Sequence, residues 1–185
     1  TVPVAGSDIE LPPDELVGKS LANYQIEAKI GESSTGSIYR AMQTNMGRKV
    51  RLYTLADSKG EEAVKNFMAN ASVKANVRQA SMLPVYEAGK ADGYHYYSCE
   101  HFSGATLAQA LDAGTLLDEK TVFSAAKTAA AALAYLWENQ IPHSPVSANS
   151  ILITRNGTIR LANIAVVDPE NGKTQGEEAI ILASL

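Results

Sequence analysis

The sequence has little cysteine and no excess of positive charge. Its single cysteine, Cys99, cannot form an internal disulfide, which excludes a disulfide-stapled secreted scaffold. The 16 Lys and Arg residues against 20 Asp and Glu give a formal net charge of -4. Because this balance provides no excess cations for a phosphate backbone, we expect no nucleic acid as a partner.

Long apolar runs are also missing. No stretch is long enough to cross a bilayer, and the N-terminus lacks the charged-then-apolar pattern of a signal peptide. We therefore predict no membrane segment in this chain and a cytoplasmic location, for the chain itself or as the cytoplasmic part of a longer protein. The first residue is Thr1 rather than methionine, which is consistent with a piece cut from something longer.

The composition that remains is that of an ordinary globular protein. Hydrophobic residues make up 45% and charged residues 19% of the 185 residues, which is enough to bury a core in one domain or two small ones. Residues 1–20 contain several prolines among small and acidic residues and show no periodicity. They are predicted to be a leader or linker.

The first half of the chain is predicted to be rich in strands. Alternating apolar and polar residues, bounded by turn residues, predict five strands at 24–30, 37–42, 49–55, 83–89 and 94–100. Gly31 to Gly36 forms one hairpin tip, and Asp92-Gly93 is a strong signal for another. Apolar residues at helical spacing between Glu61 and Val77 predict a helix after the third strand.

The second half is predicted to be rich in helix. A short helix begins near Thr106, and a long alanine-rich helix runs from about Asp118 to Asn139. Two short strands at 151–153 and 158–161 flank an Asn-Gly turn, which predicts a small hairpin. The tail after Asp168 is polar at first and ends in a short apolar run.

This order of elements, together with the residues at the turns, resembles the protein kinase fold. The similarity is greatest to bacterial serine/threonine kinases and covers residues 16–167. Residues 31–41 (GESSTGSIYRA) resemble the glycine-rich loop, residues 99–107 (CEHFSGATL) resemble the gatekeeper and hinge, and residues 141–143 (IPH) resemble the start of the catalytic loop. The strands at 151–153 and 158–161 match those that flank the metal-binding motif.

The resemblance implies an α+β fold of two lobes. We expect a five-stranded antiparallel N-lobe sheet with one αC-type helix over residues 21–100, after the leader at 1–20. A partial helical C-lobe with a small β-hairpin is expected over residues 101–185. The chain stops before the A-P-E motif of the family and the large helices behind it, so the resemblance implies a C-terminally truncated member.

The resemblance also implies a remnant of the nucleotide pocket, formed by Gly31, Ser33, Gly36, Ile38, Arg51, Cys99 and Glu100. Ser33 takes the place of the middle glycine of the loop, which is a mild change. Arg51 replaces a small residue that lies against the adenine. Its guanidinium is expected either to block the base pocket, which we favour because an apolar slot tolerates a cation poorly, or to swing out and contact phosphate.

The motif positions for catalysis carry other residues. The phosphate-binding lysine, its glutamate partner, the base aspartate, the metal-binding asparagine and the metal-binding aspartate are replaced, in that order, by Tyr53, Asn70, Pro145, Ser150 and Asn163. Phosphoryl transfer needs phosphates held by charge, metal held by carboxylates and a hydroxyl held by a base. We therefore predict no catalytic residues and no metal ligands.

Our main prediction is a pseudokinase, a kinase-like domain that is not an enzyme, needs no cofactor and acts by binding another protein or by regulation. The alternative is an atypical serine/threonine kinase or a nucleotide-binding switch that retains ATP and magnesium, with Lys49 or Arg51 substituting for the lost lysine. A third interpretation is a regulatory module of a longer signalling protein, tethered through its leader. The partner is expected to be a protein, and self-association is expected through the apolar face that a truncated C-lobe would expose.

Overall fold

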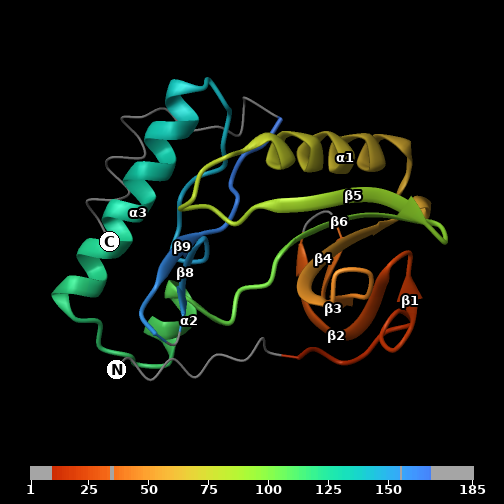
Figure 1. Cartoon of the computed structure of the whole chain (residues 1–185), viewed down its shortest axis with the longest axis horizontal. Helices are drawn as coiled ribbons and strands as arrows, with labels where there is room; N and C mark the ends of the chain where they lie inside the picture. The colour runs from red at the N-terminus through yellow and green to blue at the C-terminus, as the bar shows by residue number, and fades with distance from the viewer. Residues whose placement is uncertain (1–9, 34–35, 155, 168–185) are drawn as a thin grey trace. The chain divides into compact units, whose positions relative to one another are not determined.

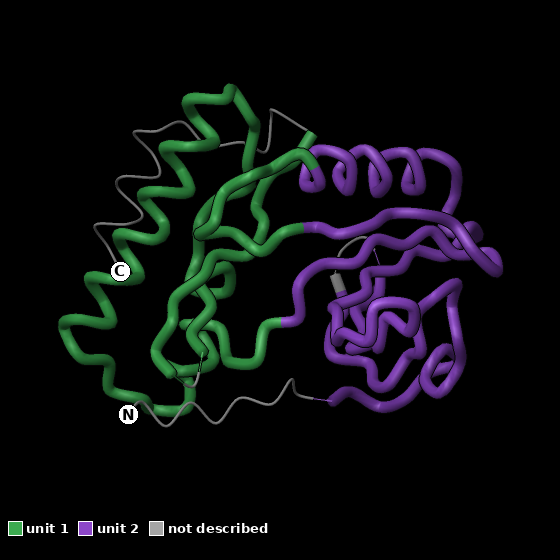
Figure 2. The backbone as a smooth tube through the Cα atoms, viewed as in Figure 1, with its two compact units in different colours: residues 1–7, 76–84, 102–185 green, residues 8–75, 85–101 purple. Residues whose placement is uncertain are grey.

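The computed structural model describes residues 10–33, 36–154 and 156–167, and the chain forms two compact units (Figure 1, Figure 2). The described residues among 10–75 and 85–101 form one unit, which we call the sheet unit. The described residues 76–84 and 102–167 belong to the other, which we call the helical unit.

The sheet unit is built on a six-stranded antiparallel sheet in the order β1-β2-β3-β4-β6-β5. Its elements are β1 (Ser20–Leu21), β2 (Tyr24–Ser33), β3 (Gly36–Gln43), β4 (Arg48–Ala56), the 3₁₀ turn η1 (Asp57–Lys59), α1 (Glu61–Asn76), β5 (Val85–Ala91) and β6 (Tyr94–Glu100). The prediction of five strands is wrong by one, because β1 has two residues and is too short for alternation to reveal it.

Alternation along the strands divides the side chains between two apolar faces. One face buries Tyr24, Ile26, Tyr39, Val50 and Leu52 in a single cluster. The other face packs under α1, where Phe67 and Ala71, one helical turn apart, contact Val85 and Tyr97. Figure 1 shows α1 running along β5. A sheet covered on both faces explains how a small unit buries so many large side chains.

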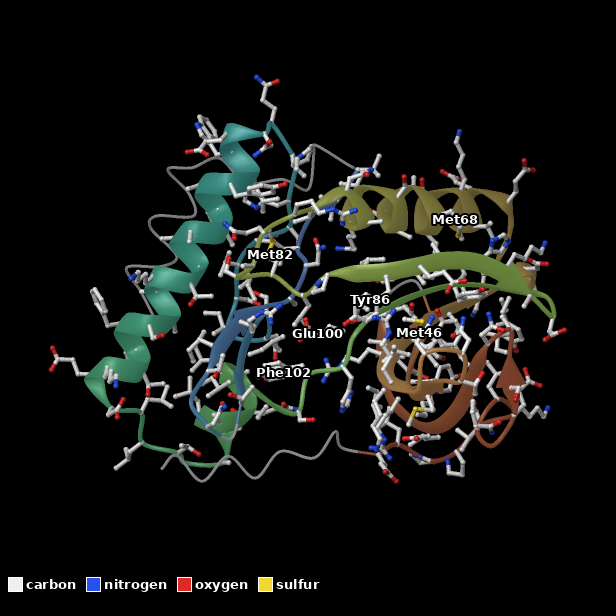
Figure 3. All side chains as sticks on the ribbon, in the orientation of Figure 1. Met46, Met68, Met82, Tyr86, Glu100 and Phe102 are labelled. Atoms are coloured by element: carbon white, nitrogen blue, oxygen red, sulfur yellow. The ribbon has the colours of Figure 1, made fainter. Side chains whose placement is uncertain are left out.

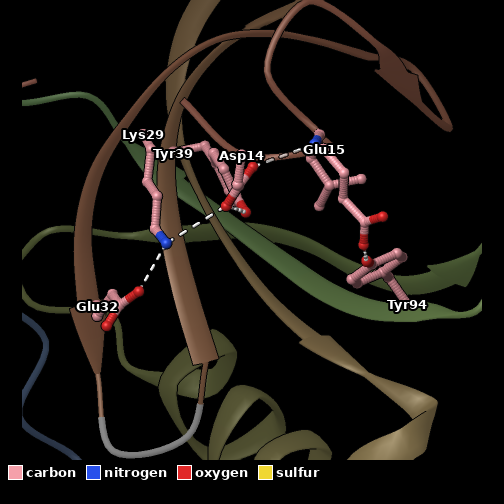
Figure 4. Close-up of polar contacts among 7 residues, drawn as sticks. Asp14, Glu15, Lys29, Glu32, Tyr39 and Tyr94 are labelled. Atoms are coloured by element: carbon pink, nitrogen blue, oxygen red, sulfur yellow. Dashed lines mark hydrogen bonds and ion pairs between the residues drawn. The ribbon is translucent and has the colours of Figure 1, made fainter. Parts of the chain in front are cut away.

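The segment before β1 is tied to the sheet by polar contacts (Figure 4). The Leu11 amide donates to the Lys29 carbonyl at 2.9 Å, and Leu16 is buried in the sheet core. The Asp14 carboxylate accepts from the Tyr39 hydroxyl at 2.7 Å and lies 3.3 Å from the Lys29 ammonium. Residues 10–19, which lie within the predicted leader, therefore contribute side chains to the sheet unit.

The helical unit contains a three-stranded antiparallel sheet in the order β7-β8-β9 and two helices. Its elements are β7 (Gly104–Thr106), α2 (Leu107–Asp112), α3 (Glu119–Glu138), β8 (Ile151–Thr154) and β9 (Ile159–Leu161). The hairpin predicted around the Asn-Gly turn is confirmed, and β7 adds a third strand that the sequence pattern did not predict. Gly104 permits this pairing, because a Cβ there would lie 2.2 Å from the Ile153 carbonyl oxygen.

Side chains fix the starts of both helices. The Thr106 hydroxyl accepts from the Gln109 amide, and the Gln109 side chain accepts from the Thr106 amide, which completes a capping box for α2. The Asp118 carboxylate caps α3 by accepting from the Thr121 amide at 2.7 Å. Both helices therefore begin where the sequence predicts.

The small residues of α3 let it pack closely. Ala125, Ala129, Ala132 and Leu136 are buried at helical spacing, and α3 contacts β9. Two hydrogen bonds join the segment 76–84 to α3. The Tyr135 hydroxyl accepts from the Arg78 amide at 3.0 Å, and the Gln79 side chain donates to the Ala131 carbonyl at 3.1 Å.

The start predicted for the fourth strand needs correction. Residues 83 and 84 belong to the helical unit, and β5 begins at Val85. The Leu83 amide donates to the Leu161 carbonyl at 3.0 Å. Leu83 packs with Leu152 and with Phe102, which is labelled in Figure 3. The alternating pattern of residues 83–89 does not reveal that Leu83 packs in the core of the helical unit while Val85 packs in the core of the sheet unit. The tail after residue 167 and the expectation of truncation lie outside the described residues.

Within the residues that the structure describes, no helix has the length and apolar character needed to cross a membrane.

Candidate functional site

The turn between β2 and β3 requires glycine at its second end. Gly36 pairs with Ser33, and a Cβ at Gly36 would lie 1.9 Å from the Thr54 carbonyl oxygen of β4. At the other end, Gly31 lies opposite Ile38 and its Cβ position is 3.4 Å from the Ile38 side chain. Gly36 thus permits the close approach of β3 to β4, whereas a Cβ at Gly31 would make a van der Waals contact with Ile38.

The predicted pocket residues gather in two adjacent cross-strand rows of the sheet unit. Ile38, Tyr53 and Tyr97 lie directly opposite one another on β3, β4 and β6. In the next row of the same face, Arg51 lies opposite Cys99. The register therefore brings together the side chains of Ile38, Arg51, Tyr53 and Cys99, which the sequence resemblance assigns to one site. Glu100 follows at the end of β6, opposite Val50.

A tyrosine ring occupies the position at which the family carries its phosphate-binding lysine. The Tyr53 ring stacks on Tyr97 with centroids 4.6 Å apart and planes at 6°, and Phe67 of α1 tilts against Tyr97 at 5.2 Å. Burial raises the pKa of the Tyr53 hydroxyl, so it stays neutral at physiological pH. Tyr53 is therefore part of the packing beneath α1.

Arg51 brings a permanent positive charge to the same place. Arg51 and Tyr53 lie two residues apart on β4 and share one face, and the positive charge of Arg51 opposes the rise in the pKa of the Tyr53 hydroxyl. It also opposes the rise in the pKa of the Cys99 thiol, which burial brings to about 12. Lys49, the other cation of this strand that the sequence suggests, places its ammonium 3.7 Å from the Glu27 carboxylate.

A second cation comes from α1, and sequence reasoning missed it. Lys74 lies near enough to Cys99 for its charge to oppose the rise in the thiol pKa. Burial lowers the pKa of the Lys74 ammonium to about 8. A usable signal was present, because Phe67, Ala71 and Lys74 follow the i, i+4, i+7 spacing of the face that α1 buries. We call Arg51, Tyr53, Lys74 and Cys99 the Arg51 cluster.

Asn70 stands at the position of the family's glutamate and lies on α1, one turn before Lys74. Its side-chain amide donates to the Asn66 carbonyl at 2.9 Å, within its own helix. The positions of the lysine and glutamate thus carry a neutral phenol and a neutral amide. The positive charge of this face is instead supplied by Arg51 and Lys74.

The other motif positions lie in the helical unit, in a loop bonded to the segment after β9. The Ser144 amide donates to the Ile164 carbonyl at 2.9 Å, and the Val166 amide donates to the Pro142 carbonyl at 2.9 Å. His143 is buried and forms a bridge with Ala165. Pro145 follows Ser144 directly; it has no backbone N–H, and its side chain offers no group that could accept a proton.

The side chains at the two metal positions are used to shape this loop. The Ser150 hydroxyl accepts from the Ser147 amide at 2.9 Å and donates to the Ser147 carbonyl at 2.8 Å. The Asn163 side-chain oxygen accepts from the Ala165 amide at 3.3 Å. Among the described residues, no group of three or more His, Cys, Asp or Glu side chains could hold a metal ion. Neither position offers a carboxylate, the protein ligand that Mg²⁺ prefers.

Comparison with known proteins identifies the family. A family model described as protein tyrosine and serine/threonine kinase matches residues 24–179, most of the chain. This chain belongs to the protein kinase family. The resemblance inferred from the turns and the order of elements is confirmed at that level.

The relatives carry serine/threonine kinase names. A probable serine/threonine-protein kinase of Clostridium acetobutylicum is 26% identical over 86% of this chain and 25% of its own length. One of Clostridium perfringens is 24% identical over 91% of this chain and 25% of its own length. Serine/threonine-protein kinase PknL of Mycobacterium tuberculosis is 27% identical over 79% of this chain and 37% of its own length. The chain thus spans between a quarter and about two fifths of these relatives.

The prediction that the chain is not an enzyme is wrong. The family that it matches is a family of enzymes, and the relatives are named as serine/threonine kinases. The prediction rested on the combined loss of five motif residues. The sequence reading considered Arg51 as a substitute for the lysine only under the alternative, and it did not consider Lys74, whose charge acts near Cys99.

Proposed function

We propose that this chain is a nucleotide-binding domain of serine/threonine kinase type, in which Arg51 supplies the positive charge for the phosphates of ATP. The observation that carries the proposal is that Arg51 and Tyr53 share one face of β4, two residues apart, in adjacent cross-strand rows. Tyr53 stands at the lysine position of the family, so Arg51 brings a positive charge to the face on which the lysine charge would lie. Of the two outcomes expected for Arg51, the proposal takes the contact with phosphate.

Arg51 suits this role better than Lys49. A guanidinium presents several N–H donors in a planar fork that matches phosphate oxygens, and it remains charged at any physiological pH. Lys49 has 53% of its side chain exposed and pairs with Glu27. Lys74 supports Arg51 from α1, since its lowered pKa of about 8 leaves the ammonium mostly protonated at pH 7. A bound phosphate would favour the protonated form further.

The binding we propose does not depend on a magnesium site in the protein. Magnesium would supply charge neutralisation at the phosphates, but the oxygens of Ser150 and Asn163 are engaged with backbone groups of their own loop. Two cations beside the phosphates would supply part of that neutralisation. We therefore expect ATP to bind in the presence of a chelator.

Phosphoryl transfer is expected to be slow rather than absent. The transition state is loose, so most of the catalysis comes from positioning and charge, to which Arg51 and Lys74 would contribute. The missing base at Pro145 is expected to lower the rate by about 100- to 10,000-fold, the usual contribution of general acid–base catalysis. The nature of the protein substrate stays open to experiment.

The test is a titration of the full chain with ATP, followed by calorimetry and by thermal unfolding, with magnesium and with EDTA. We expect saturable stabilisation in both buffers. Arg51→Ala should weaken binding at least tenfold, and Arg51→Lys should restore part of it. Lys49→Ala is the matched control, because it removes a cation from the same strand, and it should bind ATP like the natural chain.

Two results would overturn the proposal. One is that the natural chain shows no saturable binding at millimolar ATP in either buffer. The other is that Arg51→Ala binds ATP as the natural chain does.

A radiolabelled ATP assay with generic protein substrates then tests transfer, and Arg51→Ala should lower any signal in proportion to the loss of binding. A cytoplasmic location stays a prediction.

A further inference from the structure

A hollow lies on the face of the six-stranded sheet that does not pack under α1. Its volume is about 360 Å³, within the range of ligand pockets, roughly 300–1,000 Å³. The segment before β1, the start of β3, the end of β4, η1 and the start of β6 line it, and all of them belong to the sheet unit. We call it the Glu15 hollow, and its lining includes Glu15, Leu16, Ser37, Ala56, Lys59 and Tyr94.

Small side chains at the ends of two strands make room for the Glu15 hollow. Tyr39 and Leu52 lie opposite each other on β3 and β4, and both are buried in the core of this face. In the next row of the same face the opposed residues are Ser37 and Thr54, and Ala56 follows on β4. The large core side chains therefore end before the strands do, which leaves a concave surface there.

The segment before β1 closes one side of the hollow and brings a carboxylate to it (Figure 4). The buried Leu16 fixes the backbone beside Glu15, and one Glu15 oxygen accepts from the Tyr94 hydroxyl. This hydrogen bond raises the pKa of Tyr94 to about 12, so the phenol keeps its proton at neutral pH. Within the described residues Glu15 makes no other hydrogen bond or ion pair, which leaves its second oxygen for a ligand.

Asp14 also lines the hollow, but its charge is already balanced within the protein. One of its oxygens accepts from the Tyr39 hydroxyl at 2.7 Å and lies 3.3 Å from the Lys29 ammonium. The other oxygen accepts from the Leu16 amide at 3.1 Å. The negative charge that this side of the hollow offers to a ligand is therefore that of Glu15.

Lys59 brings the opposite charge to the hollow from η1. Asp57, the acid of the same turn, lies 2.8 Å from the Lys90 ammonium and 2.8 Å from the His95 ring nitrogen. Lys59 itself is exposed and makes no ion pair in the part of the chain that the structure describes. The hollow thus presents one carboxylate and one ammonium that are not paired with each other.

We propose that the Glu15 hollow binds a free α-amino acid through its ammonium and carboxylate groups. The ammonium of the ligand would lie at Glu15 and its carboxylate at Lys59, where both form charge-assisted hydrogen bonds. A small aliphatic side chain would cover Leu16 and Ala56. This site uses no residue of the Arg51 cluster and stands independently of nucleotide binding.

Charge separates a zwitterion from other small ligands. A simple anion could pair with Lys59 but would meet the carboxylate of Glu15, and a simple amine would meet the reverse. A neutral ligand such as a sugar would shield both charges from water without balancing either. An α-amino acid supplies both missing charges within one small molecule.

The test titrates the full chain with each of the twenty natural amino acids, followed by thermal unfolding and by calorimetry. We expect saturable stabilisation by at least one amino acid with a small aliphatic side chain. The amine and the acid that correspond to the best ligand, isobutylamine and isovalerate in the case of valine, each lack one charge. Each should bind at least tenfold more weakly than the amino acid.

Two variants test the two walls of the hollow. Glu15→Gln keeps an acceptor for Tyr94 and removes the negative charge, and Lys59→Met removes the positive charge from an exposed position. Each should weaken binding at least tenfold. If circular dichroism shows that Glu15→Gln has lost helix, Lys59→Met decides the outcome.

Matched controls come from α1, where Glu62 and Lys65 are exposed and lie outside the hollow. Glu62→Gln and Lys65→Met should bind the amino acid as the natural chain does, and so should Arg51→Ala. The proposal is overturned if no amino acid stabilises the chain at millimolar concentration, or if the amine or the acid alone binds as tightly. Unchanged affinity in a folded Glu15→Gln or Lys59→Met variant would overturn it too.

Discussion

Tyr53 and Tyr97 lie opposite each other on β4 and β6, with their rings stacked 4.6 Å apart at an interplanar angle of 6°. The phenol that replaces the family lysine is therefore held by aromatic packing beneath α1. Asn70, which stands at the glutamate position of the family, is neutral and donates to its own helix. The neutral residues at the lysine and glutamate positions are thus consistent with each other, and reintroducing one charge alone should be costly.

Tyr53→Lys is therefore expected to destabilise the sheet unit. The change removes a stacked pair, worth about 0.5–1.5 kcal/mol beyond its area, and buries an ammonium on the face that also carries Arg51. We expect a loss of roughly 2–4 kcal/mol in the free energy of unfolding by urea.

Asn70→Glu provides the control for Tyr53→Lys. Because the two residues would form the ion pair of the family, the double variant should be more stable than the sum of the single changes predicts, by about 1 kcal/mol or more. Strict additivity would show that Asn70 and Tyr53 do not face each other in solution. Tyr53→Phe keeps the ring and should cost little.

Lys74→Met should make the protein more stable at neutral pH. The folded-state pKa of about 8 lies below the ordinary value of 10.5, so the unfolded chain binds the proton more tightly. The stability of the natural chain is therefore reduced below pH 8, and this loss is recovered as pH rises from 8 to 10.5. Lys74→Met removes the penalty, and we expect a gain of about 1–3 kcal/mol at pH 7.

The measurement for Lys74 is the difference in unfolding free energy between Lys74→Met and the natural chain from pH 6 to 10.5. The difference should shrink toward the alkaline end. If it is constant with pH, the Lys74 ammonium does not carry the penalty. The same variant should bind ATP more weakly under our proposal, since a charge that destabilises the fold is retained where it serves binding.

The sequence predicted the elements better than the site because the two depend on different information. Alternation and turn residues locate β2, β3, β4 and β6, since each strand has a buried face and an Asn, Asp or Gly turn at its end. Two-residue β1 leaves too little pattern to detect. The site depends instead on which side chains meet across strands and helices, and motif positions alone do not show this.

Arg51 and Lys74 illustrate that limit. Motif comparison places Arg51 near the adenine, but the register of β4 and β6 is what sets it opposite Cys99, in the row next to Tyr53 and Tyr97. Lys74 belongs to no motif, and it approaches Cys99 only because α1 packs on β6 at that register. Helical spacing showed that Lys74 shares a face with Phe67 and Ala71, but it did not show what that face covers.

Gly36→Ala should be strongly destabilising, because the new Cβ would lie 1.9 Å from the Thr54 carbonyl oxygen. The backbone of β3 or β4 would have to move, and we expect a loss of roughly 3 kcal/mol or more in the free energy of unfolding. Gly47→Ala is the matched control. It has a positive φ of 61° but open space around its Cβ position, so it should cost only about 1–2 kcal/mol. Equal losses for both variants would contradict the close approach at Thr54.

Asp14→Asn should reduce the loss of stability at acidic pH. Burial alone would raise the pKa of Asp14, but hydrogen bonds from the Tyr39 hydroxyl and the Leu16 amide, with Lys29 nearby, together hold it below its ordinary value. A carboxyl with a lowered folded-state pKa contributes stability that is present above its unfolded pKa and is lost as pH falls through the folded value. The window therefore lies below about pH 4.

Urea unfolding of Asp14→Asn and the natural chain between pH 2 and 7 measures this contribution. The natural chain should be the more stable at pH 7, and the difference should shrink as the pH falls below 4. Asp92→Asn is the control, because it changes an exposed carboxyl in the β5–β6 hairpin, where Asn also tolerates the positive φ of 48°. If the difference in unfolding free energy between Asp14→Asn and the natural chain does not change with pH, the charge of Asp14 does not contribute to stability and its role is one of packing.

Cys99 should report on opening of the sheet unit, because it is the single cysteine and is buried beneath α1. Burial raises its thiol pKa to about 12, so the reactive thiolate is scarce in the folded state. At pH 8.5 we expect iodoacetamide to label the folded chain roughly a thousandfold more slowly than the chain in urea. Lys74→Met removes one of the positive charges that oppose the rise and should slow labelling further. Labelling of the native protein at the unfolded rate would show that α1 does not cover Cys99 in solution.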